Sequence, residues 1–219
     1  MRPGWVRVDC HLHSVASGDA ITTLDQIAER AAAERIDVVC ITDHNETSAA
    51  MHAAANWAGP LRVIVGEEIR TQAGEIIGLF LTERIPYVLP ALEVVARIRA
   101  QGGVVYLPHP FDAARGSLGA AAERLCADGM ADVVEVFNAK IADPARVFNR
   151  RAAELAARYG LPGGAGSDAH DPDGIGAAYL EMPDFDGPRE FLTQLALAEI
   201  TAEYRPHAVR YARRPAAPG

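Results

Sequence analysis

Two histidines that are one residue apart, His11 and His13, follow the apolar run from Trp5 to Cys10. Side chains two residues apart in an extended segment point to the same face. Both imidazoles would therefore leave the end of a strand in one direction, which suits two ligands of one metal ion. A His-x-His pair without any metal fits the pattern equally well, so the interpretation depends on partners elsewhere in the chain.

The rest of the chain supplies such partners. Of its seven histidines, five follow apolar runs: His11, His13, His44, His109 and His170. Carboxylates stand around them, namely Asp19, Asp43, Glu68, Asp112 and Asp168. Histidine and carboxylate ligands without cysteine suit Zn²⁺, Mn²⁺ or Fe²⁺ and exclude a soft thiolate site. Because these ligands exceed the needs of one ion, we expect two or three ions, with a carboxylate such as Glu68 between two of them.

The elements that must position these residues alternate between strands and helices. Apolar runs predict strands at residues 6–10, 37–42, 61–65, 75–81, 104–107, 132–137, 161–165 and 177–182. Helical spacing predicts a helix from the Thr23 capping box to Arg35 and further helices at 46–57, 91–100, 117–127, 143–159 and 190–198. The alternation predicts an α/β fold with a parallel sheet, and about seven such units predict a closed or nearly closed barrel. Catalytic groups of such barrels lie at the carboxyl ends of the strands, where the candidate ligands stand.

The length and net charge of the chain limit the kinds of partner or substrate that we expect it to bind. At 219 residues the chain can form one domain with a sizeable core. A net charge of −8 argues against a long nucleic acid, which needs a basic surface. A small phosphorylated substrate stays compatible with that charge because a metal ion supplies local positive charge.

The cysteines and the apolar runs of the sequence indicate in which cellular compartment we expect the protein. Cys10, Cys40 and Cys126 form no Cys-x-x-Cys pair, and this set fits a reducing environment. We interpret Cys10 and Cys40, which lie in apolar runs, as small buried side chains. The N-terminal segment lacks a continuous apolar signal-peptide core, and no run approaches 18 apolar residues. We therefore expect a cytoplasmic protein with no membrane partner.

Five short motifs resemble, in order, those of the PHP (polymerase and histidinol phosphatase) superfamily. They are His11-Leu12-His13, Thr42-Asp43-His44, Gly66-Glu67-Glu68, Pro108-His109-Pro110 and Gly166-Ser167-Asp168-Ala169-His170. The resemblance implies a distorted (β/α)7 TIM-like barrel. It would form a single domain over residues 1–200, before an Arg/Pro-rich tail over 201–219. Within the superfamily the sequence is most similar to the small stand-alone metal-dependent phosphoesterases.

The resemblance also implies which residues hold the two or three divalent ions. His11, His13, Glu68 and Asp168 would hold the first, Glu68 and His109 the second, and Asp19, His44 and His170 the third. Asp19 departs from the pattern, because many relatives read Ser-Asp-Gly where this chain reads Ser17-Gly18-Asp19. A second departure is the segment 135–140, which lacks the further histidine of many trinuclear members.

Four more residues are expected to support the site. Asp43, next to His44, would orient a ligand imidazole through its other nitrogen. Asp112 would close an Asx turn or support a ligand or substrate. Asn138 would ligate weakly or bind water. Arg115 would clamp a phosphate group, with a solvated loop arginine as the alternative.

The expected reaction is hydrolysis of a small phosphomonoester, a metabolite or nucleotide phosphate, by attack of a hydroxide that bridges two metal ions. Asp168 and His170 are candidate acid or base groups. Three alternatives stay open: a phosphodiesterase or nuclease with the same metals, an amidohydrolase-type C–N hydrolase with a carboxylated Lys140, and a non-catalytic metal-binding regulatory domain. The sequence leaves the substrate, the metal and the oligomeric state open.

Overall fold

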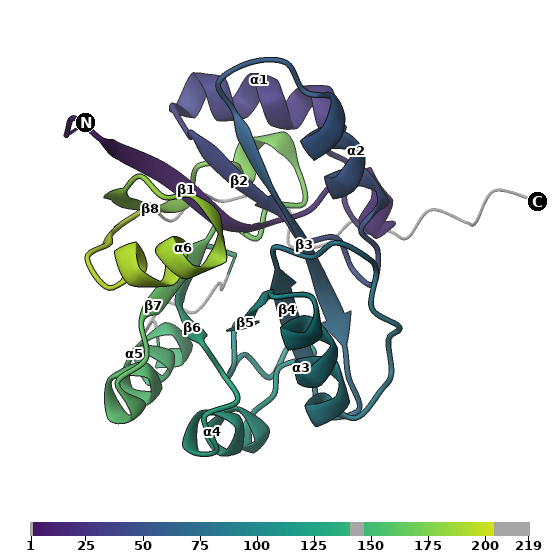
Figure 1. Cartoon of the computed structure of the whole chain (residues 1–219), viewed down its shortest axis with the longest axis vertical. Coiled ribbons are helices and arrows are strands. Elements are labelled where there is room, and N and C mark those ends of the chain that lie inside the picture. The colour runs from purple at the N-terminus through teal and green to yellow at the C-terminus, as the bar shows by residue number, and fades with distance from the viewer. Residues whose placement is uncertain (1, 141–146, 204–219) are drawn as a thin grey trace, which may run out of the picture.

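The protein is described by a computed structural model that covers residues 2–140 and 147–203. Its strands form one sheet in the order β7-β6-β5-β4-β3-β2-β1-β8-β9. The strands are β1 (Trp5–Leu12), β2 (Val38–Ile41), β3 (Arg62–Arg70), β4 (Glu75–Leu79), β5 (Val104–Leu107), β6 (Val133–Asn138), β7 (Gly163–Gly166), β8 (Ala178–Pro183) and β9 (Glu199–Ala202). The sheet curls on itself and the helices surround it (Figure 1).

The helices agree with the sequence patterns, with ends shifted by up to three residues. They are α1 (Leu24–Glu34), α2 (Ser48–Asn56), α3 (Ala91–Ala100), α4 (Ala120–Ala127), α5 (Val147–Tyr159) and α6 (Gly187–Leu195). The predicted capping box at Thr23 is confirmed, since its hydroxyl accepts from the Gln26 N–H and the Gln26 side chain accepts from the Thr23 N–H. The predicted start of α5 at 143–146 lies outside the described residues.

The barrel closes where β1 meets the segment after β7. The first half of β1 pairs antiparallel with β8, whereas its last residue, Leu12, forms a parallel bridge with Ala169. The Asp168 N–H donates to the His11 carbonyl at 2.7 Å, and the His13 N–H donates to the Ala169 carbonyl at 3.0 Å. These bonds join the β7 end of the sheet to β1 and nearly close the barrel, and the predicted α/β, distorted TIM-like barrel is confirmed.

The directions of two strands, β4 and β8, differ from the expected parallel sheet. β1, β2 and β3 are parallel, as are β5, β6 and β7, but β4 is antiparallel to β3 and β5. β3 continues to Arg70, past the expected end at residue 65, and only the turn 71–74 separates it from β4. A parallel connection needs a crossover of a dozen or more residues, so this short turn imposes a hairpin.

The other exception, β8, lies next to the edge strand β9. β8 is antiparallel to β1, and β9, which the sequence patterns did not predict, is antiparallel to β8. Because β9 spans the expected boundary at residue 200, the described sheet continues into the segment predicted as a tail. Residues 204–219 of that tail lie outside the described part of the chain, so the domain boundary stays a prediction.

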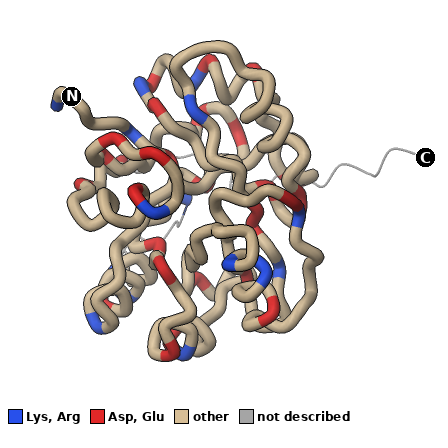
Figure 2. The backbone as a smooth tube through the Cα atoms, viewed as in Figure 1, with Lys and Arg blue, Asp and Glu red and all other residues tan. Residues whose placement is uncertain are grey.

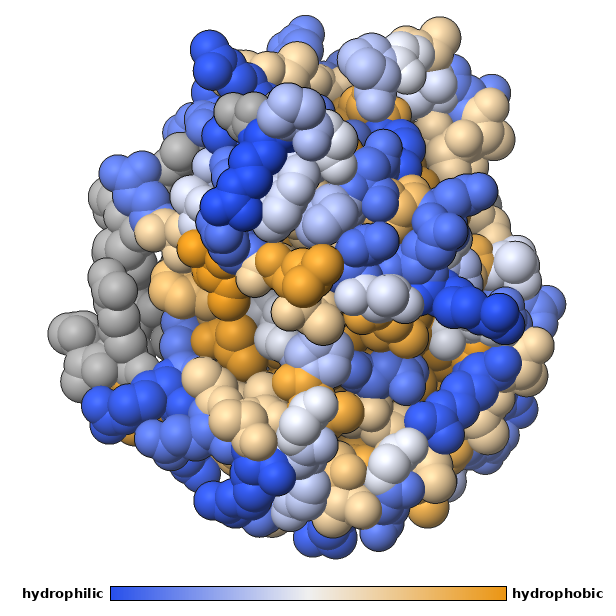
Figure 3. Space-filling model, turned by 60° about the vertical axis from the view of Figure 1, so that its left-hand side comes forward, coloured by the Kyte–Doolittle hydropathy of each residue, from blue (hydrophilic) through white to orange (hydrophobic). Residues whose placement is uncertain are grey.

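The core contains apolar side chains inside the barrel and between the sheet and its helices. Cys10, Cys40 and Cys126 are buried free thiols, which confirms the predicted burial of Cys10 and Cys40. On the surface in Figure 3, apolar residues gather near the centre of the face within a hydrophilic border. Among the helices of the described ranges, none has the length and apolar character needed to cross a bilayer.

Gly166 sets how closely β7 approaches β1. A Cβ at this position would lie 2.4 Å from the His11 Cβ and 2.8 Å from the His11 backbone nitrogen. We expect Gly166→Ala to force the two strands apart and to lower the free energy of unfolding by about 1–3 kcal/mol, the usual cost of overpacking. Urea denaturation followed by circular dichroism measures this loss.

Gly163→Ala is the matched control in the same strand. The three atoms nearest to its Cβ would belong to the Val136 side chain, with Cγ2 at 2.8 Å, rather than to the backbone of a neighbouring strand. The control should therefore be less destabilised than Gly166→Ala. Equal unfolding midpoints for Gly166→Ala and the unsubstituted protein would contradict this account of the barrel seam.

Candidate metal centre

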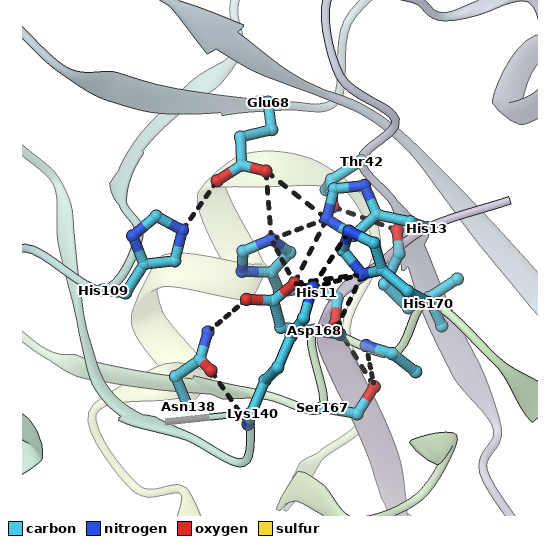
Figure 4. A network of polar contacts seen from close by, with 12 residues as sticks. His11, His13, Thr42, Glu68, His109, Asn138, Lys140, Ser167, Asp168 and His170 are labelled. Carbon is cyan, nitrogen blue, oxygen red and sulfur yellow. Dashed lines mark hydrogen bonds and ion pairs between the residues drawn. The ribbon is translucent and has the colours of Figure 1, made fainter. Parts of the chain in front are cut away.

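The structure brings the predicted ligands together at one end of the barrel (Figure 4). They come from β1 and the segment after it, from the segments after β2, β5 and β7, and from β3 itself: His11, His13, Asp19, His44, Glu68, His109, Asp168 and His170. All are buried except His44, whose side chain is 19% exposed. The parallel strands point their carboxyl ends to the same rim, which explains why motifs distant in sequence converge.

The ligand atoms form three groups that share members. In each group the atoms lie within 4.8 Å of one another: His11, Glu68 and His109; His11, His13 and Asp168; His13, His44 and His170. Because two of these histidines each belong to two groups, the groups form one continuous cluster. Such overlap suits neighbouring metal ions rather than isolated ones.

Glu68 lies between the groups. Its Oε1 is 2.8 Å from the His109 Nε2, and its Oε2 is 3.3 Å from the His13 Nε2 and 3.5 Å from the His11 Nε2. The two carboxylate oxygens therefore face different imidazoles. This is the arrangement expected of a carboxylate that bridges two cations.

Asp19 reaches the cluster despite its shifted position in the sequence. Gly18 has a φ of 79°, in the left-handed region that glycine readily adopts, and ends the short 3-10 helix Val15–Ser17. Asp19 Oδ2 then lies 3.5 Å from the His44 Nε2, and Oδ1 lies 3.6 Å from the His170 Nε2. Glycine thus compensates for the displaced carboxylate.

Two buried polar atoms of the cluster have no hydrogen-bond partner among the described residues, Asp19 Oδ1 and His109 Nδ1. Buried polar groups are nearly always paired, so an unpaired carboxylate oxygen facing imidazoles is unusual. A divalent cation would satisfy it. Together with the nitrogen and oxygen donor set, this orphaned oxygen shows that the residues fit divalent metal ions.

The backbone is strained at two of the ligands. His109 and Asp168 have φ values of 24° and 49°, in a region that non-glycine residues rarely adopt. His109 stands between Pro108 and Pro110, which restrict the chain on both sides. Such strain concentrates at functional sites, where the surrounding structure holds it in place.

Mutual electrostatics keep the central carboxylates ionised. Burial by itself raises the pKa of Glu68, but the imidazoles of His44 and His11 hold that pKa well below its usual range. Burial also opposes ionisation of Asp168, whose pKa the neighbouring Arg115 and Lys140 hold well below its usual range. Ionised carboxylates are the form that binds metal.

The histidines are affected in opposite directions. Burial lowers the pKa of His11, but nearby carboxylates, Asp168 foremost, raise it well above its usual value. Burial likewise opposes the charged form of His44, and Glu68 raises its pKa to about 9. Burial and the nearby His13 lower the pKa of His170, which leaves its ring neutral. The pKa values of histidines in one cluster are therefore shifted in opposite directions by their neighbours.

Asp43 orients a ligand indirectly. Its Oδ1 accepts hydrogen bonds from the Ser17 hydroxyl at 3.0 Å and the Ser14 N–H at 2.6 Å. The Ser17 Oγ lies 2.8 Å from the His13 Nδ1. Because the Ser17 hydroxyl donates to Asp43, its oxygen accepts from the His13 Nδ1–H, so Asp43 acts on the imidazole through Ser17 instead of bonding to it directly as expected.

Glu135 is a site residue that sequence reasoning missed. Its Oε1 lies 3.0 Å from the His11 Nδ1, while Oε2 accepts from the His109 N–H at 2.7 Å and the Asn138 amide at 2.9 Å. The side chain is fully buried. A single carboxylate inside the apolar strand β6 was the signal that could have identified it.

Asp112, Arg115 and Asn138 all lie beside the ligands. Asp112 closes an Asx turn by accepting from the Ala114 N–H at 3.0 Å, and its other oxygen is 3.1 Å from the Arg115 Nε. The Arg115 guanidinium contacts Asp168 Oδ2 and is 8% exposed, so it is not a solvated loop arginine. Asn138 donates to the same Asp168 oxygen at 3.0 Å.

A pocket of about 840 Å³ opens over the cluster. Predicted ligands line it together with four cationic side chains, Arg70, Arg84, Arg115 and Lys140, and with Glu75 and Tyr87. Lys140, which the sequence offered only as a carboxylated lysine, has its Nζ 2.7 Å from the His170 Nδ1 and 3.5 Å from Asp168 Oδ1. The cluster therefore forms the floor of an accessible, strongly polar cavity.

Comparison with known proteins gives close relatives in sequence. An uncharacterized protein of Methanocaldococcus jannaschii is 37% identical over 205 residues, which cover 88% of this chain and 80% of the relative. A second uncharacterized protein of the same organism is 36% identical over 145 residues, or 61% of this chain and 82% of the relative.

Three solved structures share the fold at 17% identity. PsfC from Pseudomonas syringae has a TM-score of 0.70, covering 91% of this chain and 92% of that one. The lesion-specific endonuclease PfuEndoQ from Pyrococcus furiosus has a TM-score of 0.68, covering 90% and 57%. A two-domain protein from Bacteroides vulgatus, described as containing a predicted PHP-like metal-dependent phosphoesterase, has a TM-score of 0.66, covering 91% and 65%. The chain thus spans less than two thirds of the last two proteins.

Family sequence profiles divide the chain into two consecutive matches. The PHP-associated family matches residues 146–199. The PHP domain matches residues 9–138, more than half of the chain and the part that holds His11, His13, His44, Glu68 and His109. With the barrel and its histidine and carboxylate cluster, this match places the chain in the PHP domain family.

Proposed function

We propose that this protein is a metal-dependent hydrolase of small phosphomonoesters, such as a metabolite or nucleotide phosphate. Membership of a family of metal-dependent hydrolases supports the general class of reaction. The observation that carries the proposal is the continuous cluster of three ligand groups on the floor of an 840 Å³ pocket, next to the buried guanidinium of Arg115.

The proposed ligand sets are those that the PHP resemblance implies, and the short distances between their members support them. His11, His13, Glu68 and Asp168 would hold one ion, Glu68 and His109 a second, and Asp19, His44 and His170 a third. These nitrogen and oxygen donors suit Mn²⁺, Zn²⁺ or Fe²⁺. Divalent ions at such a site, when bound, supply Lewis acidity and lower the pKa of water.

The protein's own residues orient the ligands and receive the substrate. Glu135 faces the His11 Nδ1 and Ser17 faces the His13 Nδ1, so each ring keeps its Nε2 toward Glu68. Arg115 is held through Nε by Asp112 and through Nη1 by Asp168 and Asn138, so its Nη2 would donate to a phosphoryl oxygen. Roles of Asp168 and His170 in moving a proton stay predictions.

Pocket size and charge support a small substrate. The cavity is of the size that holds small ligands. The chain carries a net charge of −8, and its basic residues are interspersed with acidic ones in Figure 2. A long nucleic acid usually needs a continuous basic surface. PfuEndoQ shares the fold but acts, by its name, on lesions, so nuclease activity is an outcome that the assay must test.

The compartment is part of the proposal. Buried free thiols at Cys10, Cys40 and Cys126 support a reducing environment, the cytoplasm.

The first prediction concerns metal content and ester preference. We expect two or three equivalents of Mn²⁺, Zn²⁺ or Fe²⁺ per chain by elemental analysis after reconstitution. The loaded protein should hydrolyse p-nitrophenyl phosphate faster than bis(p-nitrophenyl) phosphate, and a chelator should remove the activity. The physical reason is that the ligand groups are preformed and continuous.

His11→Ala, verified to be folded, is the matching variant because His11 belongs to two ligand groups. Full activity in this variant would contradict the proposed site. Faster cleavage of the bis-ester, or of a DNA duplex with an abasic site, would identify a phosphodiesterase instead. Less than one equivalent of metal after reconstitution would refute the metal centre.

The second prediction concerns Glu135. Its two oxygens accept from four groups, the His11 ring, the Tyr106 hydroxyl, the His109 N–H and the Asn138 amide. Glu135→Gln replaces one acceptor by an NH₂ group that faces donors. We expect metal affinity to fall about 10- to 100-fold, as for other residues that orient metal ligands. Competition with a chromophoric chelator measures it.

Glu123→Gln, an exposed glutamate on α4, is the control and should leave metal affinity unchanged. Wild-type metal affinity in Glu135→Gln would show that the orientation of His11 does not depend on this carboxylate.

A further inference from the structure

Lys140 is the single lysine among the 21 lysines and arginines of the chain. Its side chain is 4% exposed and lines the pocket. Lysine is almost never buried to this degree unless it is paired. The proposed roles of the ligands, of Glu135 and of Arg115 leave this buried cation without a function.

Two hydrogen bonds from backbone N–H groups hold the segment that carries Lys140 in place. The Ala139 N–H donates to the Gly166 carbonyl at 3.1 Å, and the Lys140 N–H donates to Asn138 Oδ1 at 3.0 Å. The first bond ties the segment to β7 next to the barrel seam. The side chain extends from this anchored turn toward His170 and Asp168 (Figure 4).

The partners of Lys140 do not fully compensate its charge. Asp168 Oδ2 already receives the Arg115 guanidinium and the Asn138 amide, while Lys140 Nζ lies 3.5 Å from Oδ1. The nearest neighbours of Nζ are the ring nitrogens of His170, at 2.7 and 3.0 Å, which carry no negative charge. A second buried cation on one carboxylate costs desolvation free energy that this contact does not offset.

The two cations reach the same carboxylate from different loops. Arg115 follows β5 and contacts Oδ2, whereas Lys140 follows β6 and faces Oδ1. Once Asp168 ligates a divalent ion, both cations lose most of its negative charge. An anion with several oxygens that enters the pocket would then restore the balance.

We propose that Lys140 is a catalytic residue that binds the phosphoryl oxygens of the substrate together with Arg115. The inference rests on the proposed phosphomonoesterase function. Lysine acts as a compact point charge and arginine as a planar fork, and both stabilise negative charge on the oxygens of a transferring phosphoryl group. A carboxylated Lys140 would instead place a further anion beside Asp168.

The test compares inorganic phosphate binding in metal-loaded variants by isothermal titration calorimetry. Lys140→Met removes the charge at similar length, and we expect phosphate to bind about 10- to 100-fold more weakly, as for a lost charged hydrogen bond. Lys140→Arg keeps a cation and should restore part of the affinity. Arg150→Met, at an exposed arginine on α5, should bind phosphate as the unsubstituted protein does.

Elemental analysis of each variant separates phosphate binding from metal binding. We expect Lys140→Met to keep the metal content of the unsubstituted protein. Loss of an ion would show that Lys140 acts on the metal site and would overturn the inference, as would unchanged phosphate affinity. An unsubstituted protein that holds metal but neither binds phosphate nor hydrolyses the monoester would refute the proposed function itself.

A second measurement uses the unsubstituted protein and does not depend on the folding of a variant. Reductive methylation modifies amines, and within the chain these are Lys140 and the α-amino group. Inorganic phosphate should slow the methylation of Lys140 and leave that of the α-amino group unchanged, as peptide mass spectrometry would show. Equal rates at Lys140 with and without phosphate would overturn the inference.

Discussion

Backbone hydrogen bonds between β1 and the segment after β7 hold the two richest ligand motifs together. They place the His11 and His13 pair beside Asp168 and His170, although more than 150 residues separate the motifs. The bonds form only because Gly166 has no side chain, since a Cβ there would overlap the His11 Cβ. The close packing at this seam is therefore what keeps the ligands within reach of one another, because a wider seam would separate His11 and His13 from Asp168 and His170.

The contact between β1 and the segment after β7 brings together ionisable side chains that a protein interior normally excludes. Three ligand carboxylates and five imidazoles lie within or at the edge of the barrel. Buried ion pairs seldom stabilise a fold, because desolvation offsets their attraction. Stability must come from the apolar layers inside the barrel and beneath the helices, while Glu135, Ser17 and Asp43 pair the Nδ1 atoms of His11 and His13, directly or through Ser17. The polar rim is therefore a functional feature supported by the rest of the molecule.

Sequence patterns predicted what depends on local spacing. The two-residue period of a strand put His11 and His13 on one face, and helical periods located α1 to α6. Such patterns could not predict contacts between different segments of the chain. Examples are the contact of Glu135 on β6 with His11 on β1 and the position of Ser17 between Asp43 and His13. Nor could they predict the hairpin that reverses β4, which depends on how far β3 extends. Register and turn length decide these features, and neither follows from apolar periodicity alone.

The fold is shared by proteins whose names indicate different activities, so substrate choice must lie in residues that the barrel does not dictate. PfuEndoQ resembles this chain over 90% of its length, with a TM-score of 0.68 and 17% identity. In this chain the loops after β5 and β6 each send one buried cation, Arg115 and Lys140, to Asp168. Adjacent strands bring both loops to the same part of the rim. In the proposed function the metal ligands would supply the hydrolytic chemistry, while these two neighbouring loops would select a phosphoryl group as the anion that enters.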